Sequence, residues 1–418
     1  MRSEEIYYIG LELTPEEIYF CNMMRYKEMG SSMLKQQSNQ SGSYRPLLLC
    51  SLAVLLATAC IPAERNASIQ STVERQAEDI RKQTVPDRRI GVFQFMKDES
   101  GAITAFETDQ PLVATKVDSL LDAHGLSEIP VQLLPDPALG DTVHAVVRVG
   151  VANLRRDPRH GAELVDQTIF GTRLKILKRQ GGWVYIQTPH KYLGWVTLDS
   201  MVPMTADEIS RWEAEPKIRV SSALSGVYER ADASSLKLSD LSMNAALTLL
   251  ESSGAWTRVK LPDGREGFTP ASDLSRPVTE TTRVPAGWEV VQTASQFHGI
   301  PYLWGGNSSR GFDCSGFTQT VFAANGFLLP RDANMQVEIG SEIPIDSTFA
   351  NVVPGDMLFF GEGDRITHVG ISLGGPRFIH ASTYVMMNSL SPSDPDYSDY
   401  RRRTLQRIKR IEQTMENL

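Results

Sequence analysis

The chain has 418 residues, of which 41% are hydrophobic and 22% are charged, so it can bury apolar cores and is not a disordered polypeptide. This length predicts about two to four domains. The formal net charge of -8 excludes the basic surface that binding to nucleic acid requires. The 4 cysteines are too few for a disulfide scaffold and form no C-x-x-C pair, so neither a stapled fold nor a zinc site is indicated.

An apolar segment lies near the N-terminus, at 47–59 (LLLCSLAVLLATA). It is too short to cross about 30 Å of hydrocarbon, but it has the length of the apolar centre of a signal peptide. The sequence LATAC at 56–60 resembles a bacterial lipobox, although Ala57 stands where leucine is usual. The resemblance implies cleavage before Cys60 and a lipid on the Cys60 thiol. A buried helix is the alternative interpretation.

Residues 1–32 fit poorly in front of a signal peptide, because glutamates outnumber basic residues there and such a leader should begin with positive charge. From Met33 onward the pattern is right, since Lys35 and Arg45 precede the apolar run with no acid between them. We therefore expect translation to start at Met33. Residues 1–59 would then be absent from the mature protein, together with two of the four cysteines.

Residues 60–140 are expected to form a tether and a small α+β region of unknown role. The polar stretch at 61–80 leads into a helix, and IGVFQF at 90–95 is strand-like. LVATKVDSLLDAHG at 112–125 has the apolar spacing of a helix. No chemistry can be assigned to this region from its sequence.

An internal repeat follows, centred on Trp183 and Trp256. The first copy reads GTRLKILKRQGGWVYIQTPHKYLGWV and the second NAALTLLESSGAWTRVKLPDGREGFT. Apolar residues alternate around each tryptophan, and glycine or proline marks the turns, which predicts short antiparallel strands in a small barrel. Both copies resemble bacterial SH3-like domains, over residues 141–205 and 216–277. The tryptophans are expected to pack in the core or at the rim of each barrel.

The C-terminal domain, residues 285–418, contains the residues that indicate catalysis. After a glycine-rich loop that is expected to be irregular, Asp313 is a good N-cap and Cys314 begins an amphipathic helix. A cysteine there lies at the positive end of the helix dipole, which predicts a lowered thiol pKa and a thiolate. Gly311 and Gly316 are expected to let a substrate backbone come close.

A thiolate needs an imidazole that protonates the leaving amine. His368 lies in RITHVGISLGG and His380 in RFIHAS, and the turn Gly-Gly-Pro between them predicts a hairpin. Adjacent strands about 4.8 Å apart would place the two imidazoles side by side. Structural histidines, an inert cysteine, or half of a metal site are the alternatives, but no further ligand lies at metal-binding spacing. The combination with the cysteine at a helix start favours nucleophilic catalysis.

These motifs together resemble the NlpC-type cell-wall cysteine peptidases, which are compact papain-like α+β domains. They are PYLWGGNSSRGFDCSGF at 301–317, PRDANMQ at 330–336, PGDMLFF at 354–360, HVGI at 368–371 and FIHAS at 378–382. With two SH3-like domains in front, the architecture is similar to the γ-D-glutamyl-L-diamino-acid endopeptidases that trim murein peptides.

The resemblance implies a role for each catalytic residue. Cys314 matches the nucleophile, His368 the general base and acid, and His380 the polar residue that orients the imidazole. Tyr302 matches a tyrosine that lines the site, where its hydroxyl would assist the oxyanion. The backbone N–H of Cys314 would be a second oxyanion donor.

The resemblance also implies a substrate-binding set. Asp313 and Ser315 would hold the free amine of the substrate's L-alanine, with Asp332 near the same pocket and Tyr192 reaching it from the first SH3-like domain. Trp304, which lies beside Tyr302 in the motif PYLWGG, is also assigned to substrate binding. A buried carboxylate needs a cation, so such a site would reject a peptide whose amine is blocked. A plain helix N-cap and a barrel-rim tyrosine are the alternatives for Asp313 and Tyr192.

The sequence therefore predicts a multidomain protein: two small all-β SH3-like barrels, a C-terminal α+β papain-like cysteine peptidase domain, and a small N-terminal α+β region. It would hydrolyse the γ-D-glutamyl–L-diamino acid bond, to meso-diaminopimelate or lysine, in murein peptides, preferring those with a free N-terminal L-alanine, in cell-wall turnover or recycling. No metal or organic cofactor is expected. We expect an extracytoplasmic monomer, anchored to a bacterial membrane through the lipid on Cys60, with no nucleic-acid partner.

Three questions stay open at this point: the function, the role of the SH3-like pair and the structure of the basic C-terminal stretch. The enzyme would act on intact peptidoglycan as an autolysin-like hydrolase, targeted by its SH3-like domains, or it would be a catalytically inactive wall-binding lipoprotein. The SH3-like pair either binds the bacterial cell wall or, as the acidic charge favours, closes one end of the active-site cleft. The basic stretch RRRTLQRIKRI at 401–411 is either a closing strand or a tail.

Overall fold

The computed structural model describes residues 68–275 and 284–412. The apolar segment 47–59, Met33 and the lipobox cysteine Cys60 lie outside the described residues. The strands below and the helices from α3 onward belong to one compact unit, Gln70–Leu418. Within the described ranges, no helix is both long and apolar enough to cross a membrane.

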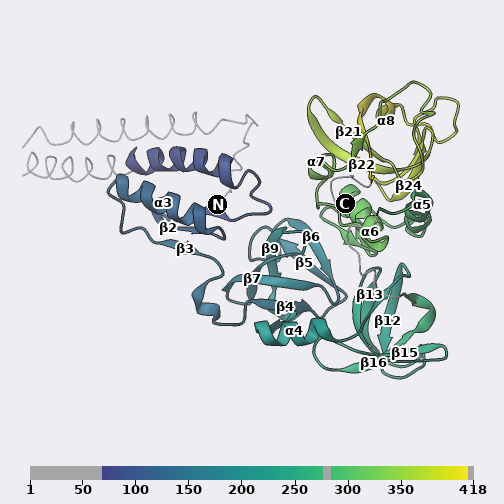
Figure 1. Ribbon diagram of the computed structural model, residues 1–418, viewed down its shortest axis with the longest axis horizontal. Helices are drawn as coiled ribbons and strands as arrows, with labels where there is room; N and C mark the ends of the chain where they lie inside the picture. Colours follow the sequence, from purple (N-terminus) through teal and green to yellow (C-terminus); the bar gives the residue numbers. More distant parts are fainter. Residues whose placement is uncertain (1–67, 276–283, 413–418) are drawn as a thin grey trace, which may run out of the picture. The chain divides into compact units, whose positions relative to one another are not determined.

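The N-terminal region is a small sheet with helices (Figure 1). Residues 68–84 are helical. Three strands form the sheet in the order β1-β2-β3, with β2 antiparallel to β1 and parallel to β3. The elements are β1 (Phe93–Lys97), β2 (Ile103–Thr108), α3 (Pro111–Ala123) and β3 (Val131–Leu133). Helix α3 buries Val113, Val117 and Leu121, spaced four residues apart along one face, which confirms the predicted helix. The strand expected at 90–95 is confirmed only in part, because it begins at Phe93 and runs to Lys97.

A first seven-stranded sheet follows, here named the first β-unit (residues 144–204). Its strands are β4 (His144–Val147), β5 (Val151–Arg155), β6 (Leu164–Ile169), β7 (Arg173–Gln180), β8 (Trp183–Gln187), β9 (Leu193–Thr197) and β10 (Met201–Met204), in the order β10-β4-β7-β8-β9-β5-β6. Alternate residues such as Leu174, Ile176, Val184 and Ile186 are buried together, as period-two spacing requires.

The second β-unit (residues 217–275) repeats the same topology. Its strands are β11 (Lys217–Val220), β12 (Leu224–Tyr228), β13 (Lys237–Ser242), β14 (Ala246–Ser253), β15 (Trp256–Lys260), β16 (Glu266–Pro270) and β17 (Leu274–Ser275). Each strand begins the same number of residues after its counterpart in the first β-unit, and the order β17-β11-β14-β15-β16-β12-β13 matches strand for strand. The internal repeat detected in the sequence is therefore a repeat of structure.

Short helical elements join and flank the two β-units. Helix α4 (Ala206–Ala214) lies between the units and begins with a capping box of Thr205 and Glu208. The 3-10 turns are η1 (Pro137–Leu139), η2 (Leu198–Ser200) and η3 (Ala271–Asp273).

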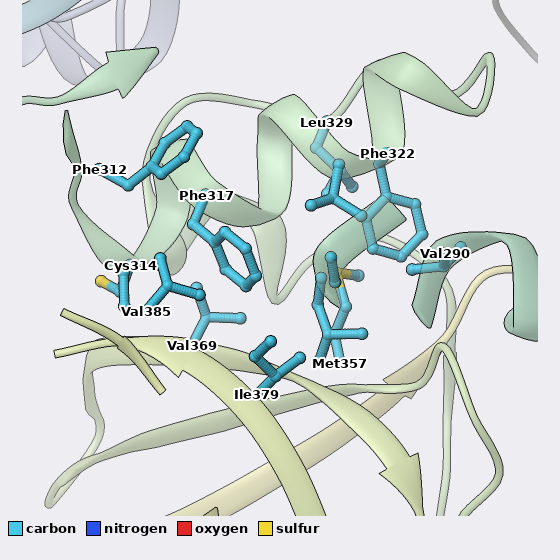
Figure 2. Close-up of a cluster of buried hydrophobic side chains, with 14 of the residues drawn as sticks. Val290, Phe312, Cys314, Phe317, Phe322, Leu329, Met357, Val369, Ile379 and Val385 are labelled. Carbon is cyan, nitrogen blue, oxygen red and sulfur yellow. The ribbon is translucent and has the colours of Figure 1, made fainter. Parts of the chain in front are cut away.

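The C-terminal domain packs helices on a six-stranded sheet of order β20-β25-β21-β22-β23-β24. The helices are α5 (Gly287–Ser295), α6 (Cys314–Ala324), α7 (Ala333–Gln336) and α8 (Asp399–Thr404). The strands are β18 (Asn307–Ser308), β19 (Gly311–Phe312), β20 (Ser341–Glu342), β21 (Met357–Glu362), β22 (Arg365–Gly374), β23 (Arg377–Ala381), β24 (Val385–Ser389) and β25 (Leu405–Arg410). A core that includes Phe317, Phe322, Met357 and Ile379 fills the space between α6 and the sheet (Figure 2).

Two expectations for this domain are decided by the sheet. The basic stretch after residue 400 provides the closing strand β25, which pairs with β20 and β21, so it is not a tail. The glycine-rich loop is not wholly irregular, because β18 and β19 form a two-stranded hairpin in it. Its regularity comes from pairing between residues only a few positions apart, which the polar, glycine-rich composition concealed.

Candidate active site

Cys314 is the first residue of α6, as predicted. Asp313 caps the helix, because its Oδ1 accepts a hydrogen bond of 2.7 Å from the backbone N–H of Gly316. The cysteine side chain lies at the edge of the apolar core beside Val385, with its sulfur directed away from the centre of the cluster (Figure 2). It also lines the large cavity described below, so the sulfur is accessible to a ligand there.

The ionisation of this thiol differs from the sequence prediction. Burial and the neighbouring Asp313 carboxylate raise the pKa of the Cys314 thiol to about 12, although the backbone N–H groups of Val369 and Ser315 act in the opposite direction. The expectation of a lowered pKa is therefore wrong for the free protein: removal of the sulfur from water outweighs the position at a helix start. The thiol must give its proton to a base when it attacks.

The two predicted histidines meet on the predicted hairpin. Strands β22 and β23 are antiparallel, and Nε2 of His368 lies 2.7 Å from Nδ1 of His380. Both side chains are buried. Burial lowers the pKa of His368 well below its usual value, with His380 and Arg401 adding to the effect. Burial likewise lowers the pKa of His380 to about 4, so both imidazoles are neutral near pH 7 and can accept a proton only transiently.

His380 has a further partner that the sequence did not reveal. Its Nε2 lies 2.9 Å from Oδ1 of Asn388, on the adjacent strand β24. The amide nitrogen of Asn388 donates to the carbonyl oxygen of Asp396 at 3.0 Å. No motif marks Asn388; a prediction that β24 pairs with β23 would have brought it close to His380 on the same face.

A buried ion-pair network supports the start of α6. Arg331 donates to both carboxylate oxygens of Asp313, at 3.0 Å and 2.6 Å, and to Oδ1 of Asp166 in the first β-unit at 2.5 Å. Arg331 and Asp166 are almost wholly excluded from solvent. Burial acts to raise the pKa of Asp166, but Arg331 and His190 outweigh it and hold the pKa below its usual value. Sequence reasoning missed Arg331 and Asp166, although Arg331 lies in the PRDANMQ motif that it used.

The glycines near the cysteine serve packing within the protein. A Cβ atom on Gly316 would lie 2.1 Å from the carbonyl oxygen of Gly306, and one on Gly311 would lie 2.8 Å from Cβ of Leu303. The expectation that these glycines make room for a substrate backbone is therefore wrong. They make room for the loop that holds Asp313 against α6.

A cavity of about 1340 Å³ opens beside Cys314. Three parts of the chain contribute to its lining: Arg89 from the N-terminal region, Glu163 and Tyr192 from the first β-unit, and Tyr302, Trp304 and Asp332 from the C-terminal domain. A cavity of this size can enclose a short peptide. Its walls carry both acidic and basic side chains, which suits a substrate with charges of both signs.

Tyr302 and Trp304 both line this cavity. Burial and the neighbouring Cys314 and Asp313 raise the pKa of Tyr302, so its hydroxyl stays protonated and can donate a hydrogen bond. The indole N–H of Trp304 donates to Glu163 at 3.0 Å, which links the C-terminal domain to the first β-unit. Glu163 was not predicted from the sequence.

Tyr192 and Asp332, assigned to one pocket from the sequence, are in contact. The hydroxyl of Tyr192 donates to Oδ2 of Asp332 at 3.0 Å, and Nη1 of Arg89 donates to the same oxygen at 2.6 Å. The other oxygen, Oδ1, lies 3.9 Å from Nη1 of Arg331, beyond hydrogen-bond distance, and is left to accept a further bond. The acidic and aromatic groups of this pocket therefore come from different domains.

Asp313 and Ser315 line this cavity, as expected, but their side chains are hydrogen-bonded within the protein. Asp313 accepts bonds on both oxygens, from Gly305, Gly316 and Arg331, so neither oxygen is left open for a ligand. The Ser315 hydroxyl lies between Asp313 and Arg331, at 3.3 Å and 3.1 Å. A carboxylate with its lone pairs occupied has no need of a substrate ammonium. The N-cap alternative for Asp313 describes the structure better.

The alternative of a metal site has no support from the geometry. In residues 68–275 and 284–412, no three His, Cys, Asp or Glu side chains come together as metal ligands would.

A helix-start cysteine facing a sheet that bears two hydrogen-bonded histidines defines a papain-like thiol peptidase. The model of the NlpC/P60 family matches residues 299–407, and the model of the bacterial dipeptidyl-peptidase Sh3 domain matches residues 154–201. The chain belongs to the NlpC/P60 family and is a cysteine peptidase that hydrolyses peptidoglycan peptides.

Relatives and a solved structure agree with this assignment. The chain is 32% identical over 227 residues to a γ-D-glutamyl-L-lysine dipeptidyl-peptidase of Bacillus subtilis (strain 168), covering 51% of this chain and 71% of the relative. It is 30% identical over 267 residues to dipeptidyl-peptidase 6 of Lysinibacillus sphaericus, covering 61% of this chain and 94% of the relative. A crystal structure of an NlpC/P60 family protein from Bacillus cereus ATCC 10987 superposes with a TM-score of 0.55 at 22% identity, covering 64% of this chain and 99% of that one, which supports the fold alone.

Proposed function

We propose that this peptidase hydrolyses the bond between γ-D-glutamate and an L-diamino acid, meso-diaminopimelate or lysine, in murein peptides with a free N-terminal L-alanine, in cell-wall turnover or recycling. The observation that carries the proposal is the pocket beside Cys314, where one oxygen of Asp332 is left to accept a bond. The names of the relatives from Bacillus subtilis and Lysinibacillus sphaericus support a dipeptide-releasing activity of this kind.

The chemistry follows from the residues around the sulfur. Cys314 attacks the γ-carbonyl carbon while His368 takes the thiol proton, which gives a tetrahedral oxyanion. The Tyr302 hydroxyl and the backbone N–H of Cys314 would donate to that oxyanion. His368 then passes its proton to the departing amine, leaving a thioester. Water, deprotonated by the same imidazole, hydrolyses the thioester and restores the thiol.

The pocket would favour peptides whose N-terminal amine is free and positively charged. An ammonium group fits Oδ1 of Asp332, while Oδ2 is held by Tyr192 and Arg89. An amine that is acylated brings no positive charge and would leave this carboxylate facing the uncharged end of the peptide. Discrimination of about 100-fold or more is typical when a polar site loses its partner in this way. Asp332 therefore replaces Asp313 as the carboxylate assigned to the amine.

In this proposal the first β-unit forms one side of the active-site cavity rather than a module that binds the cell wall. Three contacts support this: Asp166 pairs with buried Arg331, Tyr192 reaches Asp332, and Glu163 accepts from Trp304. A module that searches for peptidoglycan independently would not share a buried ion pair with the catalytic domain. A surface so engaged is not free to bind intact wall.

The test compares three substrates: the tripeptide L-Ala-γ-D-Glu-L-Lys, its N-acetylated form, and intact sacculi. We expect rapid release of L-Ala-γ-D-Glu from the free tripeptide only. Cys314→Ala should abolish release, and activity of this variant equal to that of the parent would remove the nucleophile assignment. Equal rates on sacculi and free tripeptide would instead support the autolysin-like alternative.

Asp332→Asn tests the amine subsite directly. We expect kcat/KM for the free tripeptide to fall at least about 30-fold, with little change for the N-acetylated form. Asp346→Asn is the matched control, because Asp346 is a half-buried aspartate outside this cavity whose side chain bonds to Thr348 in its own turn. A uniform loss on both peptides would show that Asp332 has no role in selecting the amine.

We further propose that the mature protein is extracytoplasmic and carries its lipid on Cys60. The support is the sequence pattern at 56–60, which lies outside the described residues. The test is detergent-phase partitioning of the expressed protein beside a Cys60→Ser variant. Equal partitioning of the two into the aqueous phase would exclude the anchor.

A further inference from the structure

The hydrogen-bonded chain that joins His368 and His380 ends at a neutral amide, the side chain of Asn388. Nε2 of His380 meets Oδ1 of Asn388 at 2.9 Å, and the same amide group donates from Nδ2 to the carbonyl oxygen of Asp396 at 3.0 Å. Nothing in the family resemblance or in the comparisons assigns a role to Asn388. Its side chain is partly buried on β24, next to the strand that carries His380.

The protons of this chain of contacts can be placed by elimination. A carbonyl oxygen only accepts hydrogen bonds, so the amide nitrogen of Asn388 must face Asp396 and its oxygen must face His380. That oxygen also only accepts, so Nε2 of His380 must carry a proton. A neutral imidazole has one N–H, which leaves Nδ1 of His380 as an acceptor.

The same reasoning reaches the base. Nδ1 of His380 lies 2.7 Å from Nε2 of His368, so Nε2 of His368 must be the donor of that bond. Nδ1 of His368 is then unprotonated, and it is the one atom of this imidazole that can take the proton of Cys314. The opposite tautomers would place the lone pair of His380 against the oxygen of Asn388 and a proton on Nδ1 of His368.

We propose that Asn388 is a positioning residue that, acting through His380, keeps His368 in the tautomer that can deprotonate Cys314. The inference rests on the proposed function, because it takes His368 as the general base. Each imidazole holds one proton before and after the choice of tautomer, so no proton is gained or lost.

The charges around the pair explain why an amide is suited to this position. Arg401 on α8 is the cation that acts on both imidazoles, and it lowers the pKa of each. The carboxylate of Asp396 is turned to Arg377 at 3.0 Å, and Asp394 accepts from Ser389. In the part of the chain that the structure describes, no carboxylate is hydrogen-bonded to either ring.

Two rings pack against His380. The Phe378 ring packs against it at 4.8 Å between centroids, and His368 contacts it from β22. A carboxylate in place of the amide would attract a second proton to His380. Doubly protonated His380 has no acceptor, and His368 would then have to accept through Nε2 and lose its free Nδ1.

The experiment measures pH profiles of kcat for the wild-type protein, Asn388→Ala and Asn388→Asp on L-Ala-γ-D-Glu-L-Lys. For Asn388→Ala we expect kcat to fall about tenfold or more with KM within about twofold, because the productive tautomer is no longer enforced. For Asn388→Asp we expect the acidic limb to move up by about one pH unit or more, with activity recovering as pH rises. Asn351→Ala is the control, since the Asn351 amide also donates to a backbone carbonyl but lies on the surface.

Nitrogen-15 NMR of the imidazoles in a Cys314→Ala background provides a readout that needs no turnover. We expect protons on Nε2 of both His368 and His380, and loss of this single pattern when Asn388 is also replaced by alanine. A proton on Nδ1 of His368 in the parent, or profiles of Asn388→Asp that superimpose on the wild type, would overturn the inference. A wild-type protein that leaves the tripeptide intact would overturn the proposed substrate, while the NMR still decides the tautomer.

Discussion

Arg331 offers the sharpest test of how the domains hold the catalytic helix. Its guanidinium is buried between Asp313 and Asp166, with a 1% exposed side chain. Replacing it by methionine keeps the length and apolar stem but leaves two buried carboxylates facing each other with no cation. Loss of one partner from a buried ion pair typically costs about 3–5 kcal/mol. We expect a loss of that size in the free energy of unfolding of Arg331→Met at neutral pH.

The assay is urea unfolding followed by tryptophan fluorescence, with Arg310→Met as the matched control. Arg310 pairs with Asp240 across a similar contact to the second β-unit, but both side chains are well exposed, so about 1 kcal/mol or less should be lost there. Without the guanidinium, burial is no longer opposed by Arg331 and raises the pKa of Asp166 in the folded state. The stability deficit should therefore shrink as pH falls and grow as pH rises.

A second substitution tests whether unpaired buried charge causes the loss of stability. Arg331→Met combined with Asp166→Asn removes one of the two stranded charges and should recover part of the lost stability. An Arg331→Met protein as stable as its Arg310→Met control would refute the buried network. So would a deficit that stays the same as pH is lowered, because protonation of buried Asp166 should reduce it.

Three further tests concern the site itself. Tyr302→Phe should lower kcat about 100-fold with little change in KM, because one oxyanion donor is lost; an unchanged kcat would remove that role. Gly316→Ala should destabilise the protein by about 1–3 kcal/mol, since its Cβ would meet the Gly306 carbonyl oxygen at 2.1 Å, whereas Gly182→Ala, with open space around it, should be near neutral in thermal unfolding. Burial lowers the pKa of His380 from 6.5 to about 4, so the folded protein resists protonation there. The free energy of unfolding should therefore fall by roughly 3 kcal/mol as pH drops from about 6.5 through 4. Denaturation near neutral pH and near pH 4 measures this, and His380→Gln should show a smaller loss.

Much of the architecture could be read from local patterns. The repeat around Trp183 and Trp256 is a period-two pattern that recurs at constant spacing, and the strands recur at that same spacing. The hairpin that carries His368 and His380 follows from two strand-like runs joined by a glycine-rich turn. Asp313 and Cys314 mark a helix start by residue type alone. These features depend on residues close together in the chain, so sequence reasoning could reach them.

Other features depend on which distant residues meet. Arg331 bonds Asp166 across 165 positions, and Arg89 bonds Asp332 across 243, so neither contact leaves a trace in local spacing. The partner of His380, Asn388, became visible only once β24 was paired with β23.

The sequence by itself determined the chemistry that is available: one thiol at a helix start, two imidazoles on a hairpin and a repeated barrel pattern. Tertiary structure decided how that chemistry is set. It raised the pKa of the Cys314 thiol, and it paired Asp313 with Arg331 and Oδ2 of Asp332 with Tyr192 and Arg89. The physical reason is that pKa values and free lone pairs depend on burial and on neighbouring charges, and both arise only when distant segments pack together.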